Sequence, residues 1–222
     1  MSNHSIERIV NAESSTLYIF FGGLAGGLAM PPFEFFKSAK LLDDNIIFVR
    51  DISQNWYQSG VKDISTDVEE TVDFFKNEIT RIAPKKIFFV GNSMGGYAAI
   101  MFASLLQNQS VKVIAFSPQT FIHPFLRLKY RDFRWQSTIN KTYLKSFKKS
   151  SYYDLNSLLN KLSINIDIDI YVSKKDKLDT KHAQYLANTT QVKVISYNQA
   201  GHGLVRHLRN EGLLVKILKR NQ

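Results

Sequence analysis

The chain has 222 residues, of which 44% are hydrophobic and 22% are charged, and its formal net charge is +10. This composition is typical of a folded globular protein and argues against long disordered segments, and the length suits one α/β domain. Cysteine is absent from the whole sequence, which excludes disulfide bonds, thiolate nucleophiles and cysteine-based zinc sites.

The sequence alternates short apolar runs with helical patterns. Six runs rich in β-branched and aromatic residues predict strands, at about 17–21, 46–50, 86–90, 111–116, 166–172 and 192–197. Most are apolar nearly throughout, as is typical of strands that are covered on both faces. Helices are expected at about 68–79, 93–107, 180–189 and 204–219. The alternation predicts an α/β fold with a mostly parallel, doubly wound sheet of about six strands, in a single domain that spans residues 1–222.

A weakly polar run extends from Leu17 to Met30 and is too short to span a bilayer. The residues before it carry Glu7 and Glu13 against Arg8. They therefore lack the positively charged start of a secretory signal, and we expect a cytoplasmic protein without a transmembrane segment.

The segment Phe21-Gly22-Gly23-Leu24-Ala25-Gly26-Gly27 begins where the first of these strands ends. Glycines let the backbone approach a substrate closely and turn its amides inward. The segment has neither a G-x-G-x-x-G pattern nor a Walker lysine, which argues against a phosphate-binding loop. We therefore predict that the backbone N–H of Gly23 or Leu24 stabilises an oxyanion, and the sequence does not choose between the two.

The strongest chemical signal is the segment Gly91-Asn92-Ser93-Met94-Gly95-Gly96. It follows the strand predicted at 86–90 and precedes a helix-friendly stretch, which is the setting in which a G-x-S-x-G serine exposes its hydroxyl above a sheet. The bare pattern is common by chance, whereas this setting is not. We predict that Ser93 is a nucleophile and that the backbone N–H of Met94 is an oxyanion donor.

The segment from 119 to 163 interrupts the alternation, because it has no clear strand. It is rich in aromatic residues, and the stretch from Arg127 to Lys149 holds eight basic residues against one acid, Asp132. We expect a small helical, basic and aromatic cap over a pocket, in preference to a packing excursion whose aromatics belong to the core. The charge indicates either a solvated face or a surface that attracts an anionic partner. No known nucleic-acid-binding motif accompanies it.

A serine nucleophile needs a base that removes its proton and a carboxylate that orients the base. Gly201-His202-Gly203 follows the last strand and opens the last helix, so we predict His202 as the base, with His123 in the cap segment in reserve. The acid is expected soon after the strand at 166–172. We favour Asp176 over Asp179, because Asp179 looks better placed to cap the helix that follows.

Together these features resemble the α/β-hydrolase fold superfamily. The resemblance covers most of the chain, from about Leu17 to Lys219, and its carriers occur in the superfamily's order of nucleophile, acid and base. The first antiparallel strands of the full fold are missing from the pattern unless Ile6 to Val10 forms one. The chain therefore resembles a compact member.

The resemblance assigns a role to each residue singled out above: nucleophile Ser93, orienting acid Asp176, general base His202, and oxyanion donors Met94 with Leu24 or Gly23. It implies a serine hydrolase that cleaves an ester or thioester through an acyl-enzyme, with acyl transfer to another acceptor as a variant. The substrate would be a small molecule or carrier-bound acyl group, and an anionic one would suit the basic segment. We expect no metal, no cofactor and no nucleic-acid partner. From a different class, a non-catalytic binding or assembly factor for an anionic partner would keep the same fold.

Overall fold

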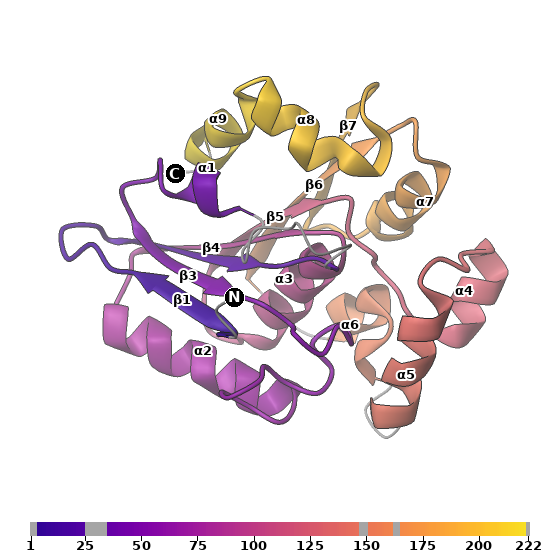
Figure 1. Ribbon diagram of the computed structural model, residues 1–222, viewed down its shortest axis with the longest axis horizontal. Helices are drawn as coiled ribbons and strands as arrows, with labels where there is room; N and C mark the ends of the chain where they lie inside the picture. The colour runs from indigo at the N-terminus through magenta and orange to yellow at the C-terminus, as the bar shows by residue number, and fades with distance from the viewer. Residues whose placement is uncertain (1–3, 25–34, 147–150, 162–164, 221–222) are drawn as a thin grey trace.

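The computed structural model describes residues 4–24, 35–146, 151–161 and 165–220. Its centre is a sheet of seven strands in the order β1-β3-β2-β4-β5-β6-β7 (Figure 1). The strands are β1 (Ile6–Ile9), β2 (Thr16–Phe21), β3 (Asn45–Val49), β4 (Lys86–Asn92), β5 (Val111–Phe116), β6 (Ile166–Ser173) and β7 (Val192–Tyr197). All neighbours are parallel except β1 and β3. The predicted fold class is confirmed, with seven strands where about six were predicted.

The additional strand is β1, at the edge of the sheet. It runs antiparallel to β3, with Ile6 opposite Val49 and Ile9 opposite Ile46. This is the segment whose pairing the sequence pattern left open, because its four residues are only partly buried and lack the continuous apolar run of the inner strands. By contrast β2 and β3 are buried throughout, since helices cover both of their faces.

Helices pack on both faces of the sheet (Figure 1). One face contacts α2 (Val68–Ile82), α3 (Met94–Leu105), α6 (Leu155–Lys161) and α7 (Lys177–Leu186). The other face contacts α1 (Phe36–Ala39), α8 (Leu204–Asn210) and α9 (Leu213–Arg220). The helix predicted at 204–219 is thus two helices, which separate at Gly212, where φ is +67°. None of the described helices is long and apolar enough to cross a bilayer.

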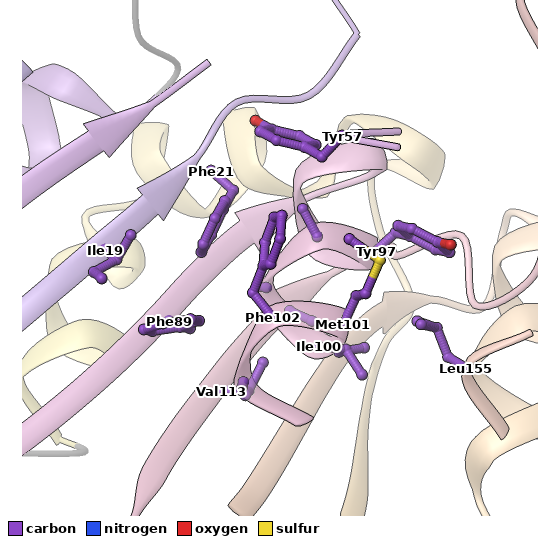
Figure 2. Close-up of a cluster of buried hydrophobic side chains, with 14 of the residues drawn as sticks. Ile19, Phe21, Tyr57, Phe89, Tyr97, Ile100, Met101, Phe102, Val113 and Leu155 are labelled. Carbon is purple, nitrogen blue, oxygen red and sulfur yellow. The ribbon is translucent and has the colours of Figure 1, made fainter. Parts of the chain in front are cut away.

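Helix α3 is buried along almost its whole length, because its sequence is apolar on all sides. Figure 2 shows its side chain Phe102 packed beside Phe21 on β2, with Phe89 on β4 close by, while Tyr97 lies beside Met101. The rings of Phe21 and Phe102 stack with their centroids 5.7 Å apart. The core therefore fixes α3, and with it the turn at its first residue, Met94, relative to the ends of the strands.

The predicted cap segment, residues 119–163, forms α4 (Pro124–Tyr130), α5 (Gln136–Ser146) and α6. Its aromatic side chains divide between two environments. Phe121 and Tyr153 are buried, whereas Phe125 is 66% exposed and Phe133 is 58% exposed. Residues 147–150 and 162–164 lie outside the described residues. Part of the segment therefore belongs to the core, while α4 and α5 lie beside one another at one side of the molecule (Figure 1).

Candidate active site

Ser93 occupies a strained turn between β4 and α3. Its φ and ψ are 55° and −118°, a conformation that a residue with a side chain rarely adopts. Its backbone N–H donates to the carbonyl of Phe116 on β5 at 2.9 Å. The flanking glycines permit the turn, because a Cβ on Gly91 would lie 2.1 Å from the carbonyl oxygen of Gly95. The turn predicted from the sequence is therefore present in the structure.

A hydrogen-bonded line connects Ser93 with His202 and Asp179. His202 Nε2 lies 3.1 Å from Ser93 Oγ, and His202 Nδ1 lies 2.7 Å from Asp179 Oδ2. An ionised carboxylate only accepts hydrogen bonds, so Nδ1 carries the proton and Nε2 accepts from the serine hydroxyl. The side chain of Asp179 is 1% exposed and that of His202 is 34% exposed. The buried carboxylate thus orients an imidazole whose other ring nitrogen contacts the Ser93 hydroxyl.

Asp176 and Asp179, the two aspartates after β6, have the opposite of their predicted roles: Asp176 caps the helix and Asp179 contacts His202. Asp176 is the N-cap residue of α7, and its Oδ1 accepts the backbone N–H groups of Leu178 and Asp179 at 3.0 and 2.9 Å. The prediction that Asp176 contacts His202 is corrected, since Asp179 makes that contact. The reason is local. The helix begins at Lys177, so Asp176 caps it and Asp179 lies in its first turn.

The loop that carries His202 is anchored on the neighbouring strand. Gly201–Gly203 forms a single 3-10 turn after β7, and the N–H of Gly201 donates to Ser173 Oγ at 3.1 Å. Ser173 is the buried last residue of β6. The reserve base His123 sits at the N-cap of α4. The imidazole that meets the Ser93 hydroxyl is that of His202.

The loop after β2 passes directly against the start of α3. A Cβ on Gly95 would lie 2.2 Å from the carbonyl oxygen of Phe21 and 2.9 Å from the carbonyl carbon of Gly22. Met94 is the first residue of α3, where backbone N–H groups have no partner within the helix and the helix dipole favours negative charge. The structure therefore brings the two predicted sources of oxyanion donors side by side.

Gly23 and Leu24 follow this contact. The Tyr57 hydroxyl donates to the carbonyl of Gly22 at 2.9 Å and fixes the start of the loop. Leu24 is half-buried against the core. The remainder of the predicted loop, residues 25–27, lies outside the described residues. Gly23 and Leu24 both stay candidates for the second donor.

Solved structures of other proteins share the fold of this chain. No protein-family model and no curated protein matches the sequence. A capsule O-acetyltransferase of Neisseria meningitidis serogroup A superposes with a TM-score of 0.71 at 14% identity, over 97% of this chain and 92% of that one. MGS-M2, an α/β hydrolase enzyme from a deep-sea metagenome library, superposes with a TM-score of 0.61 at 13% identity, over 98% and 94%. The chain has the α/β-hydrolase fold.

A third structure matches over nearly the whole length of both chains. A lipase-esterase related protein from Clostridium acetobutylicum superposes with a TM-score of 0.62 at 14% identity, over 97% of this chain and 99% of that one. Proteins named as hydrolases and as an acetyltransferase thus share this α/β-hydrolase fold. At such identity the likeness shows the fold, and the chemistry has to be argued from the site.

Gln119 is a site residue that sequence reasoning missed. In this α/β-hydrolase fold it lies in the loop after β5, and its Nε2 donates to Ser93 Oγ at 2.8 Å. Its Oε1 accepts from Trp56 Nε1 at 3.3 Å. The indole can only donate, so it fixes which end of the amide faces the serine. Both side chains are buried. No motif marks Gln119, and only its place after β5, which pairs with the strand that precedes Ser93, could have drawn attention to it.

The electrostatics favour a charged acid and a basic imidazole. Burial disfavours the charge on Asp179, but the hydrogen bonds and positive charges of His202 and Arg134 outweigh it and hold the pKa of Asp179 below its ordinary value. Burial likewise opposes protonation of His202, but the hydrogen bond and charge of Asp179 raise the pKa of His202 above its ordinary value. Asp179 is therefore ionised at neutral pH.

Asp176, Asp179 and His202 also lie close enough together to hold a metal ion, with one ligand atom of each within 4.8 Å of the others. The Arg134 guanidinium fits that use poorly, because its Nη1 lies 2.8 Å from Asp179 Oδ1 and 3.9 Å from Asp176 Oδ1. A fixed cation beside both carboxylates repels a second cation. The donor set therefore fits a proton relay better than a metal site.

Proposed function

We propose that the chain is a serine-dependent enzyme that cleaves an ester or thioester through an acyl-enzyme on Ser93. The observation that carries the proposal is the continuous line from Asp179 through His202 to the Ser93 hydroxyl, at 2.7 Å and 3.1 Å. A serine hydroxyl is a weak nucleophile until a neighbouring base takes its proton. This base is oriented by a buried carboxylate, which is the arrangement that such activation requires.

The first half of the proposed reaction forms the acyl-enzyme. Ser93 Oγ attacks the substrate carbonyl while its proton moves to His202 Nε2. The carbonyl oxygen becomes an oxyanion, which accepts hydrogen bonds from the N–H of Met94 and from that of Gly23 or Leu24. The tetrahedral intermediate then collapses, the bond to the alcohol or thiol breaks, and that leaving group takes the proton from His202.

The second half releases the acyl group. A water molecule or an acceptor hydroxyl gives its proton to His202 and attacks the acyl carbon, and the Ser93 oxygen recovers the proton as its ester bond breaks. The two outcomes differ only in the acceptor. The fold shared with a capsule O-acetyltransferase supports including carbohydrate hydroxyls among the acceptors to be tested.

The surface of α4 and α5 supports an anionic substrate or acyl carrier. The exposed side chains there include the basic residues Lys129, Arg131, Lys141 and Lys145. The one acid within these helices and their connection, Asp132, is buried. The region therefore presents uncompensated positive charge, which attracts anions from solution and does so less strongly as salt rises. We expect hydrolysis of a negatively charged ester to lose kcat/KM with salt more steeply than hydrolysis of a neutral ester of equal length.

A fluorophosphonate probe, which reacts covalently with activated serines, tests the nucleophile. We expect labelling of the wild-type chain at Ser93, located by mass spectrometry of the labelled peptide. S93A should lose the label, and H202A should react at least about 10³-fold more slowly. The matched controls S137A and H207A should react like the wild type. Labelling that persists in S93A, or an unchanged rate in H202A, would contradict the proposal.

Acyl esters and thioesters of graded length, offered with and without a carbohydrate acceptor, then define the substrate. A rate of product formation that rises with acceptor concentration indicates transfer, and a rate independent of acceptor indicates hydrolysis. The rival function is a binding or assembly factor that holds an anionic partner on the basic surface. It would be favoured if the probe and every ester failed to react while salt-sensitive binding to polyanions remained.

A further inference from the structure

Arg134 joins the candidate triad to a second carboxylate. It lies between α4 and α5, and its Nη1 donates to Asp179 Oδ1 at 2.8 Å. On its other edge, Nε and Nη2 donate to Oδ1 and Oδ2 of Asp132 at 3.0 and 2.8 Å. Asp179 therefore has one oxygen on His202 and the other on Arg134, which leaves it little freedom to rotate.

Asp132 is itself held from the opposite side. Its Oδ2 also lies 2.9 Å from His182 Nε2 on α7. The backbone N–H of Thr120 lies 3.0 Å from His182 Nδ1 and can only donate, so Nδ1 accepts and Nε2 is the atom that donates to Asp132. His182 is fully buried, and burial outweighs the neighbouring aspartates to lower its pKa. A neutral histidine thus fixes the carboxylate that fixes Arg134.

The backbone and the neighbouring ring complete the support of Arg134. The carbonyl of Arg134 accepts from Arg127 Nη2 at 2.7 Å, and its N–H donates to Asp132 Oδ1 at 3.0 Å. Its guanidinium carbon lies 4.8 Å from the centre of the Trp135 ring, which in turn lies 5.7 Å from the ring of His202. These partners fix the Arg134 side chain more fully than an isolated surface ion pair would.

We propose that Arg134 is a positioning residue, which the α4–α5 region supplies to hold Asp179 in the orientation that aims His202 at Ser93. This inference rests on the proposed function of Ser93. Arg134 touches neither the nucleophile nor the base directly. It acts by bridging Asp132 and Asp179, so the geometry of the relay depends on the α4–α5 region that supplies Arg134.

The charge of Arg134 has a separate consequence, which a purely structural role would lack. The charged groups that act on His202 are Asp179 and Asp176, which raise its pKa, and Arg134, which lowers it. Removal of Arg134 should therefore raise the pKa of His202 further. Since the base works only when neutral, the acid limb of the pH–rate profile should move to higher pH.

The test compares R134M, R134K and D132N with the matched control K129M, in which an exposed lysine of α4 is replaced. Two quantities are measured: the rate of fluorophosphonate labelling as a function of pH, and the titration of His202 by NMR in histidine-labelled protein. Circular dichroism checks that each variant folds. D132N keeps the charge of Arg134 but weakens the contact that holds its guanidinium. It therefore separates the effect of position from that of charge, and it replaces R134M as the test if R134M fails to fold.

We expect R134M to react about 10 to 100-fold more slowly, as a small misplacement of a catalytic group does, with its acid limb higher by about half a pH unit or more. R134K should also be labelled slowly, but the acid limb of its pH–rate profile should lie where it does in the wild type. The ammonium keeps the charge but cannot bridge the two carboxylates. D132N should be slow with a nearly unchanged limb. K129M should match the wild type in both quantities.

R134M with the wild-type labelling rate and the wild-type His202 titration would overturn the inference. D132N with an unchanged rate would overturn the anchoring step. If the wild-type chain is not labelled at Ser93, the proposed function fails, and the titration still decides the role of Arg134. In that case an unchanged pKa of His202 in R134M overturns the inference, and a raised pKa supports the placement of the Arg134 charge beside Asp179 and His202.

Discussion

The described residues include two aspartate–histidine pairs, and only one of them contacts Ser93. In the first, Asp179 binds Nδ1 of His202 and leaves Nε2 for Ser93. In the second, Asp132 binds Nε2 of His182, and the backbone of Thr120 takes Nδ1. The pairs use the same two functional groups at similar distances, yet the second pair has no free ring edge.

The difference shows why His202 is the candidate base and His182 is not. The side chain of His202 is 34% exposed, and that of His182 is 1% exposed. Burial lowers the pKa of His182 despite its aspartate, whereas Asp179 raises the pKa of His202 despite partial burial. A carboxylate beside an imidazole is therefore not enough. The ring must also offer its other nitrogen to a reacting group.

The largest expected contrast comes from replacing each histidine in turn. H202Q should slow fluorophosphonate labelling by about 10⁴-fold or more, because it removes the base, while its free energy of unfolding stays near that of the wild type. H182Q should keep labelling within about tenfold of the wild type but lose about 2 kcal/mol of stability, because the buried carboxylate of Asp132 loses the hydrogen bond from His182 and keeps only those from Arg134 and the backbone. Labelling rates and urea denaturation measure both effects. Slow labelling in H182Q together with near wild-type labelling in H202Q would exchange the roles of the two pairs.

The aspartates after β6 provide the next contrast. D179N should slow labelling by about 10⁴-fold, because an amide favours the wrong imidazole tautomer. D176A should leave labelling within a few-fold of the wild type and cost about 1 kcal/mol of stability, as loss of a helix cap does. A larger loss of labelling in D176A than in D179N would restore the placement first predicted from the sequence.

Gln119 should have a smaller effect, because it orients the hydroxyl and moves no proton. Q119L removes the donor that faces Ser93 Oγ and should slow labelling by about 3 to 10-fold, which corresponds to one hydrogen bond. W56F removes the indole donor and should have a weaker effect in the same direction. The exposed Gln136 gives the control Q136L, which should react like the wild type. Equal rates in Q119L and Q136L would remove Gln119 from the site.

The smallest expected effect is the pH dependence of stability, in which the two histidines act in opposite directions. The pKa of His202 is raised on folding, so its stabilisation is present at low pH and is lost as pH rises through that pKa. The pKa of His182 is lowered, so the unfolded state takes its proton first and stability falls as pH drops below about 6.5. Relative to the wild type, H202Q should therefore gain stability, and H182Q lose it, as pH rises across this range. Urea denaturation at several pH values measures the slopes.

The fold could be predicted largely from local pattern. Continuous apolar runs placed the inner strands, because a strand covered on both faces must be apolar throughout. β1 gave a weaker signal, since its pairing depends on β3, more than 35 residues away. The Ser93 turn and the His202 loop could also be predicted from local sequence, because glycines flank both residues. The contact between Ser93 and His202 in the structure supports the proposed proton relay.

The remainder of the site depends on contacts that no local pattern encodes. The choice between Asp176 and Asp179 depends on where α7 begins, and a shift of three residues in the expected start exchanges the cap and the contact. Asp132 and His182 are 50 residues apart, and no sequence motif near either residue predicts their contact. The one available hint was that Asp132 is the single acid in a basic stretch, where an ion pair with a neighbouring cation is expected.

The network around Arg134 limits how this protein can be recombined with others. A chimaera that exchanges only the α4–α5 region would leave His182 opposite no carboxylate and Asp179 without its cation. A working graft has to carry Asp132 and Arg134 together and to enter a host with a histidine at the matching place on α7. A transplant of this region would thus require Asp132, Arg134 and His182 to be transferred as one unit.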